Sequence, residues 1–270
     1  MPAAMFMQEF VLSHPEFLVL LDAVQAHLVV GIDPKSLFPL DEGERRAVLE
    51  EGKAALQQRG ALKNQGPGEY QLTPAFGALA RTIAYPEVAI VIVRDMAGIG
   101  PQLFLHYTAR GKFVEQTFPR EHVHRLALLP DLTTMIERER YILALEDIPA
   151  TDTMLEMSED TFRAVKDLVR YQPPERAEAF FTRYGATASE AVTLYQAFAH
   201  RTSTGSVAIL RCDQEKIIDA RSIFVLQGAG SAWHATQKEP GVPLLSIQST
   251  NASDIKYQLL QYFEALSPSV

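Results

Sequence analysis

Short β-branched and aromatic segments, separated by turns rich in glycine and proline, occupy the middle of the chain. Residues 88–94 form the first segment, residues 102–109 the second and residues 112–118 the third. The residues between them, 95–101 and 110–111, include the glycines and the proline that turns favour. This alternation predicts antiparallel strands joined by tight turns, which together form a β-meander.

The same pattern recurs 119 positions later in the chain (207 − 88 = 119). At that shift, residues 207–210 fall on residues 88–91, residues 223–226 fall on residues 104–107, and Gly230 falls on Gly111. Side-chain identity between the two halves is low, so a chance similarity of two α+β halves is the competing interpretation. We interpret the match as an internal duplication.

Apolar residues at helical spacing surround both meanders. In the first half they predict helices over residues 16–27, 42–59, 74–84 and 132–145, with residues 63–70 as a loop. In the second half they predict helices over residues 158–171 and 175–184, a third that starts at Thr187 or Ser189, and a closing helix over residues 253–266.

The expected fold class is α+β, built from pseudo-twofold, duplicated helix–β-meander–helix units. Residues 146–153 are the expected junction between the halves. We therefore expect a first α+β half over residues 1–150 and a second over residues 151–270, packed as one globular domain.

Composition and charge argue against several classes of protein. Hydrophobic residues make up 47% of the 270 residues, which is ordinary for a chain that buries a core. A formal net charge of −8 argues against nucleic-acid binding, which normally needs a basic face. No apolar run approaches the roughly 18–20 residues of a membrane span, and the N-terminus does not resemble a signal peptide. Cys212 is the only cysteine, so we expect no intramolecular disulfide and a cytoplasmic location.

Three histidines, His106, His122 and His124, lie close together in the sequence. The spacing of His122 and His124 would place both imidazoles on one face of a strand, and His106 could supply a third metal ligand. Surface histidines on a polar strand are the favoured interpretation, because no known metal-binding signature accompanies them. We therefore expect no metal and no cofactor.

The sequence contains no recognisable catalytic motif. A nucleophile elbow and a Walker A pattern are both absent, and the glycine pairs at 98–100 and 228–230 lie between strand-like segments rather than before a helix. Cys212 is expected to be a partly buried structural cysteine rather than a reactive thiol. The sequence therefore predicts a protein without catalytic residues.

Apolar residues occupy two connections where polar residues are the rule. Met96 and Ile99 lie in the turn 95–101, and Ile217 and Ile218 lie in the matching connection, residues 214–220. Exposed apolar residues at hairpin tips often mark a partner site. The competing interpretations are that a turn folds back on the body of the protein, or that the second pair continues a strand.

The order of these segments resembles the EspG family, which comprises chaperones associated with type VII (ESX) secretion. In the first half, the resemblance is carried by a helix that ends in residues 57–62 (Gln-Gln-Arg-Gly-Ala-Leu), by a helix over residues 72–83, and by Tyr85-Pro86 leading into strands. In the second half, it is carried by residues 219–224 (Asp-Ala-Arg-Ser-Ile-Phe), residues 230–233 (Gly-Ser-Ala-Trp), Pro240-Gly241 and the amphipathic C-terminal helix. The resemblance is one of order and spacing over about residues 10–266.

The resemblance implies a pseudo-symmetric α+β fold without catalytic residues. It also implies a cytosolic role in binding the apolar tip of a helical secretion substrate of the PE–PPE type. The family's binding surface involves sheet connections and the C-terminal helical region, which here correspond to Asp95, Met96, Ile99 and Pro101, and to Tyr257, Leu260 and Phe263. The last three residues have a spacing that equally well packs a helix against a core.

Three hypotheses follow. The leading one is a non-enzymatic binding protein or secretion chaperone, present as a monomer or a weak homodimer. The alternative is a metal-dependent hydrolase that uses His106, His122 and His124. The third is a structural module that forms homo-oligomers through its apolar turns.

Overall fold

An antiparallel sheet of ten strands runs through the protein. The computed structural model describes residues 8–37, 41–66, 69–214, 216–239 and 241–266. The first half contributes β1 (Gln8–Ser13), β4 (Val88–Met96), β5 (Gly100–Ala109), β6 (Lys112–Arg120) and β7 (Val123–Leu129). The second half contributes β8 (Met154–Ser158), β9 (Arg201–Asp213), β10 (Lys216–Gly228), β11 (Ser231–Gln237) and β12 (Leu244–Ser249). The strand order is β1-β7-β6-β5-β4-β9-β10-β11-β12-β8.

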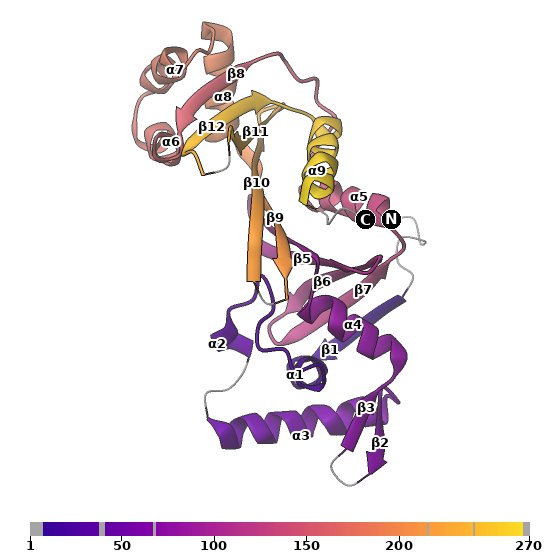
Figure 1. Ribbon diagram of the computed structural model, residues 1–270. Helices are drawn as coiled ribbons and strands as arrows, with labels where there is room; N and C mark the ends of the chain where they lie inside the picture. Colours follow the sequence, from indigo (N-terminus) through magenta and orange to yellow (C-terminus); the bar gives the residue numbers. More distant parts are fainter. Residues whose placement is uncertain (1–7, 38–40, 67–68, 215, 240, 267–270) are drawn as a thin grey trace.

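The two halves meet where β4 pairs with β9. Ile90 pairs with Ile209, and Ile92 pairs with Val207, in an antiparallel ladder. Residue 209 is also the position that a shift of 119 assigns to residue 90. The strand order reads the same from either edge, with β1 in the place of β8 and β4 in the place of β9. The ladder between β4 and β9 therefore joins the strands of both halves in one continuous sheet, and the long strands β9 and β10 lie in its middle (Figure 1).

Helix starts follow local capping chemistry. Ser13 caps α1 (His14–Ala23) and Thr187 caps α8 (Ala188–Ala199), each in a capping box with a glutamate three residues later. Side chains of Asp41, Asp131 and Ser158 cap α3 (Glu42–Gln58), α5 (Leu132–Ile142) and α6 (Glu159–Tyr171). The other helices are α2 (Pro34–Leu37), α4 (Pro74–Ala84), α7 (Pro174–Arg183) and α9 (Ala252–Leu266).

Alternation along the strands divides the apolar residues between two faces of the sheet. On one face, Ile90, Val207 and Val225 pack with α5 and α9, which lie side by side across the joint between the halves (Figure 1). On the other face, α1 and α4 cover the first half, with α3 packed outside α1, and α6, α7 and α8 cover the second half. We call the first of these the α5/α9 face and the second the bundle face.

One expected loop is a second, small sheet. Residues 63–70 were expected to form a loop, but β2 (Leu62–Gly66) pairs with β3 (Glu69–Leu72) as an antiparallel hairpin. The polar and glycine-rich composition of this stretch suggested a loop, yet backbone pairing and the contact of Leu72 with the core of the first half stabilise the hairpin. Within the described residues, no helix is both long and apolar enough to cross a membrane.

Candidate partner-binding groove

The first expected partner-binding turn is a tight hairpin. β4 continues to Met96 and β5 starts at Gly100, so residues 97–99 alone form the tip. Asp95 pairs with Pro101, and Gly98 and Gly100 adopt positive φ angles of 81° and 88° that glycine tolerates best. Ile99 exposes 61% of its side chain at this tip, whereas Met96 is half-buried.

The second apolar connection is strand rather than turn. Ile217 and Ile218 belong to β10, and each is 53% exposed. Because β4 and β9 are antiparallel neighbours, the tip at residues 97–99 lies beside the start of β9, whereas Ile217 lies near its end. The two apolar segments therefore lie near opposite ends of β9 and do not form one surface.

The expected contact residues of α9 lie on the α5/α9 face. Phe263 is only 8% exposed and belongs to the core beneath α5, and Leu260 packs against the same core. Tyr257 is 65% exposed. Asp95 follows the opposite alternation from Ile90 and Ile92, so it lies on the bundle face, away from α9. The two predicted sets of contact residues therefore do not form a single site.

A groove on the bundle face lies between α6 and the strands β9, β10 and β11, whereas α6 itself packs against β8 and β12. Its volume is about 450 Å³, and strands β9, β10 and β11 form its floor. The apolar side chains that line it are Phe162, Phe198, Phe224, Leu226, Ala235 and Leu245. The Phe162 ring meets Phe224 edge-on at 5.3 Å between centroids, and it meets Phe198 edge-on at 6.1 Å. These aromatic residues are half-buried: they pack against the core of the second half and also line the groove.

Charged residues surround this aromatic groove. Asp95 contributes from the β4–β5 hairpin, Arg201 from the start of β9, and Glu159, Arg163 and Lys166 from α6. Arg163 and Glu159 form an ion pair at 2.5 Å. Lys166, Arg201 and Asp95 have no ion-pair partner within 4 Å among the described residues. An apolar floor with a charged rim is suited to binding an amphipathic protein segment.

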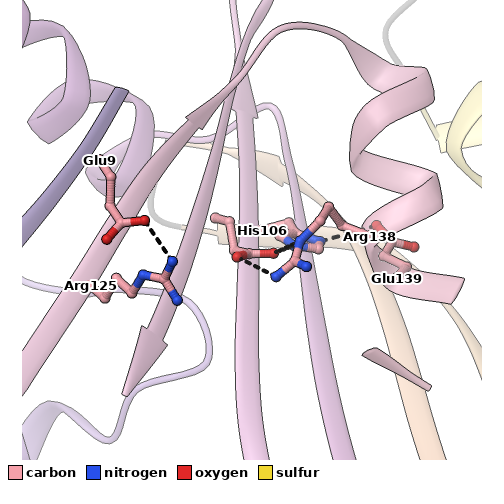
Figure 2. A network of polar contacts seen from close by, with 6 residues as sticks. Glu9, His106, Arg125, Arg138 and Glu139 are labelled. Carbon is pink, nitrogen blue, oxygen red and sulfur yellow. Dashed lines mark hydrogen bonds and ion pairs between the residues drawn. The ribbon is translucent and has the colours of Figure 1, made fainter. Parts of the chain in front are cut away.

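His106, the first histidine of the metal hypothesis, is fully buried in an ionic network. Its Nε2 atom lies 3.1 Å from Glu115 and its Nδ1 atom lies 3.2 Å from Glu139, while Arg138 forms two hydrogen bonds of 2.9 Å with Glu115 (Figure 2). Burial alone would lower the pKa of His106, but the bonds and charges of Glu115 and Glu139 outweigh it and raise the pKa to about 9. The network joins β5 and β6 to α5.

The two glutamates of this network have opposite pKa shifts. Burial raises the pKa of Glu115, but the hydrogen bonds and charges of His106 and Arg138 outweigh it and lower the pKa to about 2. Burial dominates for Glu139 and raises its pKa, and no described atom hydrogen-bonds its Oε2 atom. Because all four side chains are more than nine-tenths buried, the network is a structural clamp rather than a substrate site.

The other two histidines lie away from His106. His122 occupies an exposed turn with φ 59° just before β7, not the strand that the spacing predicted. His124 lies on β7 with its ring on the bundle face, stacked at 4.1 Å on Phe17, whereas His106 lies on the α5/α9 face. The metal set His106, His122 and His124 is therefore wrong. No group of three metal-ligating side chains assembles in the described part of the chain.

The sequence interpretation did not identify His14 as a partner of His124. The Leu37 carbonyl can only accept a hydrogen bond, so the His14 Nε2 atom, at 3.1 Å, carries a proton. The Nδ1 atom of neutral His14 then accepts from His124 Nε2 at 3.1 Å, and His124 Nδ1 accepts from Gln116 at 2.8 Å. Burial, together with the nearby charges of His14 and His122, lowers the pKa of His124 to about 3. The two rings form a neutral, directional chain of hydrogen bonds.

No family model matches the chain, and no curated protein matches it in sequence. Among solved structures, the chain is similar to the type VII secretion system chaperone EspG5 of Mycobacterium tuberculosis, solved in complex with a PE25-PPE41 dimer. The TM-score is 0.68 at 12% sequence identity, over 93% of this chain and 94% of EspG5. At this identity the match is one of fold: the protein shares with EspG5 a mixed architecture of helices and a large antiparallel sheet.

Proposed function

We propose that this protein is a non-enzymatic, cytoplasmic secretion chaperone that holds the apolar tip of a helical partner in the groove beneath α6. The observation that carries the proposal is the row of Phe162, Phe198 and Phe224 along an open groove. Partly exposed aromatic side chains that gather along one groove often mark a site that a partner covers. The shared fold with a chaperone solved in complex with a PE-PPE dimer supports a partner of PE–PPE type, or another type VII substrate.

The β4–β5 hairpin extends this proposed surface at one end. Asp95 lines the groove, and Ile99 is exposed at the tip of the same hairpin. We place Pro101 in the same contact region, because it pairs with Asp95 across the hairpin. Met96 borders the tip, but it follows the alternation of Ile90 and Ile92 and therefore adjoins the region from the opposite face of the sheet. Of the three residues on α9, Tyr257 has the exposure that a contact needs, but it would belong to a separate surface on the α5/α9 face.

The charged rim predicts the composition of the partner. Lys166 and Arg201 are exposed cations without an ion-pair partner among the described residues, whereas Glu159 is already paired with Arg163. Complementary charges near an interface mainly set orientation and association rate. The partner is therefore a helical tip with apolar residues for the groove and carboxylates for Lys166 and Arg201.

We also infer that the scaffold arose by duplication of a unit of about half the chain, residues 1–150 and 151–270. The palindromic strand order and the pairing of Ile90 with Ile209 support this inference. Equivalent turns support it too: Arg110 and Gly111 both have positive φ angles, as do Ala229 and Gly230, 119 positions later. A pseudo-twofold axis through the Ile90–Ile209 pair would relate the two halves.

Reversing two rim charges tests the proposed groove. The tagged wild type, the variant Lys166→Glu/Arg201→Glu, and a control Arg46→Glu/Lys63→Glu are expressed in the source organism, and co-purified proteins are quantified by mass spectrometry. All four positions are exposed, and each variant replaces two cations with two glutamates, so both variants change the net charge of the protein by the same amount. We expect the wild type and the control to capture a helical secretion substrate, and the rim variant to capture at least tenfold less. Equal capture by all three proteins would contradict the proposal.

A second pair of substitutions separates partner binding from self-association. Ile99→Asp and Met96→Asp place a charge at the hairpin tip, where it would oppose burial against an apolar partner. Light scattering is expected to show the same monomeric mass as the wild type, while capture of the partner falls. A wild-type dimer that the substitutions convert to a monomer would favour the homo-oligomeric module instead.

A further inference from the structure

A second hollow, remote from the partner-binding groove, lies between the end of α4 and the β5–β6 turn. Its volume is about 310 Å³. Helix α4 and its C-cap contribute Ala78, Arg81, Thr82 and Tyr85, and the hairpin contributes Ala109, Arg110 and Lys112. Three of these seven residues are cations, and the lining includes no acidic residue among those that the structure describes.

These three cations lack counter-charges. Arg81, Arg110 and Lys112 are exposed, and none forms an ion pair within 4 Å with any residue of the described ranges. The nearest recorded acidic contact is Glu87, whose carboxylate accepts the backbone N–H of Arg110 at 3.2 Å, not its guanidinium. On a protein with a formal net charge of −8, three unpaired cations around one hollow are unexpected.

The neutral hydroxyl groups of this hollow already donate their protons to backbone carbonyls. Thr82 donates its hydroxyl proton to the Ala78 carbonyl at 3.0 Å, and Tyr85 donates to the Val24 carbonyl at 2.8 Å. The remaining side-chain donors are the two guanidinium groups and the ammonium group. A ligand of this hollow is therefore recognised by charged donors, which favour an anion with several acceptor oxygens.

The second half of the chain shows that the fold itself does not require this hollow. At a shift of 119, Ala109 corresponds to Gly228, Arg110 to Ala229 and Lys112 to Ser231. An added Cβ on Gly228 would lie 2.5 Å from the Ala197 carbonyl oxygen and 2.7 Å from that of His200, so the end of α8 packs directly against the hairpin. The same type of turn is therefore formed without cations and with close packing in one half, but with three cations and an open hollow in the other.

A favourable interaction with the dipole of α4 explains only one of the three cations around the hollow. Arg81 lies in the last turn of α4, where a cation interacts favourably with the carbonyl end of the helix. Arg110 lies in the hairpin turn and Lys112 is the first residue of β6. Their equivalents, Ala229 and Ser231, occupy the same places around a turn with similar positive φ angles. The two hairpin cations therefore have no structural role that their neutral counterparts cannot fill.

We propose that the hollow between α4 and the β5–β6 turn is a binding site for a phosphate-type anion, held by Arg81, Arg110 and Lys112. The phosphate group belongs either to a small soluble molecule or to the headgroup of an anionic lipid. Both guanidinium groups can offer paired N–H donors to two phosphate oxygens, and Lys112 adds a third positive charge. This site is independent of the partner-binding groove, which lies over the second half of the sheet.

The test removes the two hairpin charges without disturbing the turn. Arg110 has φ 52°, and asparagine followed by glycine suits a turn with two positive φ angles, so Arg110→Asn is compatible with the native backbone. The variant Arg110→Asn/Lys112→Gln is compared with the wild type and with Arg46→Gln/Lys63→Gln, which removes two exposed cations elsewhere. Thermal unfolding confirms folding, and the single change Lys112→Gln is used if the double variant does not fold.

Isothermal titration with inorganic phosphate at low ionic strength, and flotation with phosphatidylcholine vesicles with and without phosphatidic acid, provide the two readouts. We expect saturable binding of one phosphate per chain, with a Kd on the order of 1 mM or tighter. Binding should weaken at least tenfold in the hairpin variant and stay unchanged in the control. Vesicle binding that needs phosphatidic acid and is lost in the hairpin variant, without binding of free phosphate, would identify a lipid headgroup. Binding of neither probe, or equal binding by all three proteins, would overturn the proposal.

Discussion

At the scale of single residues, His124 makes the fold sensitive to acid. Its pKa of about 3 in the folded protein is below the value of 6.5 for a free histidine, so the unfolded chain binds more protons between these values. The stability that neutral His124 contributes is complete above pH 6.5 and is lost as the pH falls towards 3. From pH 6.5 to pH 5, the expected loss is on the order of 2 kcal/mol.

The variant His124→Phe tests this pH dependence. Phenylalanine can keep the stack on Phe17 but cannot titrate. Urea unfolding at pH 6.5 and pH 5 should show a smaller loss of unfolding free energy than in the wild type, although the variant starts about 1–3 kcal/mol lower because Gln116 and His14 lose a partner. His122→Asn, at an exposed position with positive φ, should keep most of the wild-type dependence, because the charge of His122 is the smallest of the three causes that lower the pKa of His124. Equal pH dependence in all three proteins would contradict the role of His124.

His106 has the opposite pH dependence. Its pKa is raised to about 9, so the stability that charged His106 contributes is complete below pH 6.5 and is lost as the pH rises through 9. His106→Leu leaves Glu115 and Glu139 without their shared cation and should lower the unfolding free energy by about 3–5 kcal/mol at pH 7. Urea unfolding should show this deficit shrinking between pH 7 and pH 9.

Glu139→Gln provides the matched comparison for His106→Leu. Burial already raises the pKa of Glu139, and its Oε2 atom has no partner in the described structure. Glu139→Gln should therefore lower the free energy of unfolding by less than His106→Leu does. If Glu139→Gln destabilises the protein more than His106→Leu, then Glu139 is the essential ionised group of the network.

At the scale of elements, Gly228 controls how closely α8 approaches the sheet. An added Cβ would lie 2.5 Å from the Ala197 carbonyl oxygen and 2.8 Å from the Arg201 Cα atom, and neither backbone atom can move alone. Gly228→Ala should therefore lower the unfolding free energy by about 1–3 kcal/mol through overpacking. Gly98→Ala, which meets no atom within 4 Å but has φ 81°, should cost about 1–2 kcal/mol from backbone strain alone. Thermal unfolding of the two variants compares these costs.

Elements with strong local signals could be predicted from the sequence. Helix α4 was expected over residues 74–84 and has these bounds, and α8 starts after Thr187 because a threonine followed three residues later by glutamate forms a capping box. Strand ends were less predictable. Ile217 and Ile218 are predicted to lie in a connection, because residues 214–220 match the turn 95–101 at the shift of 119, with continuation of a strand as the competing interpretation. Pairing of Ile217 with Cys212 of β9 shows that the strand continues there. Tertiary pairing decides where this strand begins.

The candidate groove illustrates what sequence periodicity cannot resolve. Phe162, Phe198 and Phe224 come from α6, α8 and β10, and each occupies an apolar position of its own element. A regular apolar position predicts burial, but it does not say whether a neighbouring element will cover it. Asp95 is the predicted contact residue that also lines the groove, because it lies near the end of β4, the strand next to β9, on the bundle face.

At the scale of the whole molecule, the central core belongs to both halves. It combines Ile90, Ile92 and Met135 from the first half with Val207, Ile209 and Ile255 from the second. Each half alone would expose its share of this core together with an unpaired edge, β4 or β9, at the place where the ladder joins them. An exposed apolar edge strand promotes aggregation. We therefore predict that neither half folds independently, even though each half also has helices and a separate core that it does not share with the other half.

This shared core predicts one cooperative unfolding transition for the full chain. Trp233 is buried in the core of the second half, so its fluorescence reports there, and hydrogen exchange of the β5 and β6 amides reports on the first half. Both probes should give the same urea midpoint, because losing the β4–β9 ladder exposes the common core to water. Ile209→Ala should lower both midpoints together, by an amount that corresponds to about 2–5 kcal/mol. Two separate midpoints, or a soluble and cooperatively folded fragment 151–270, would show that the halves are independent units joined only by the backbone pairing of β4 and β9.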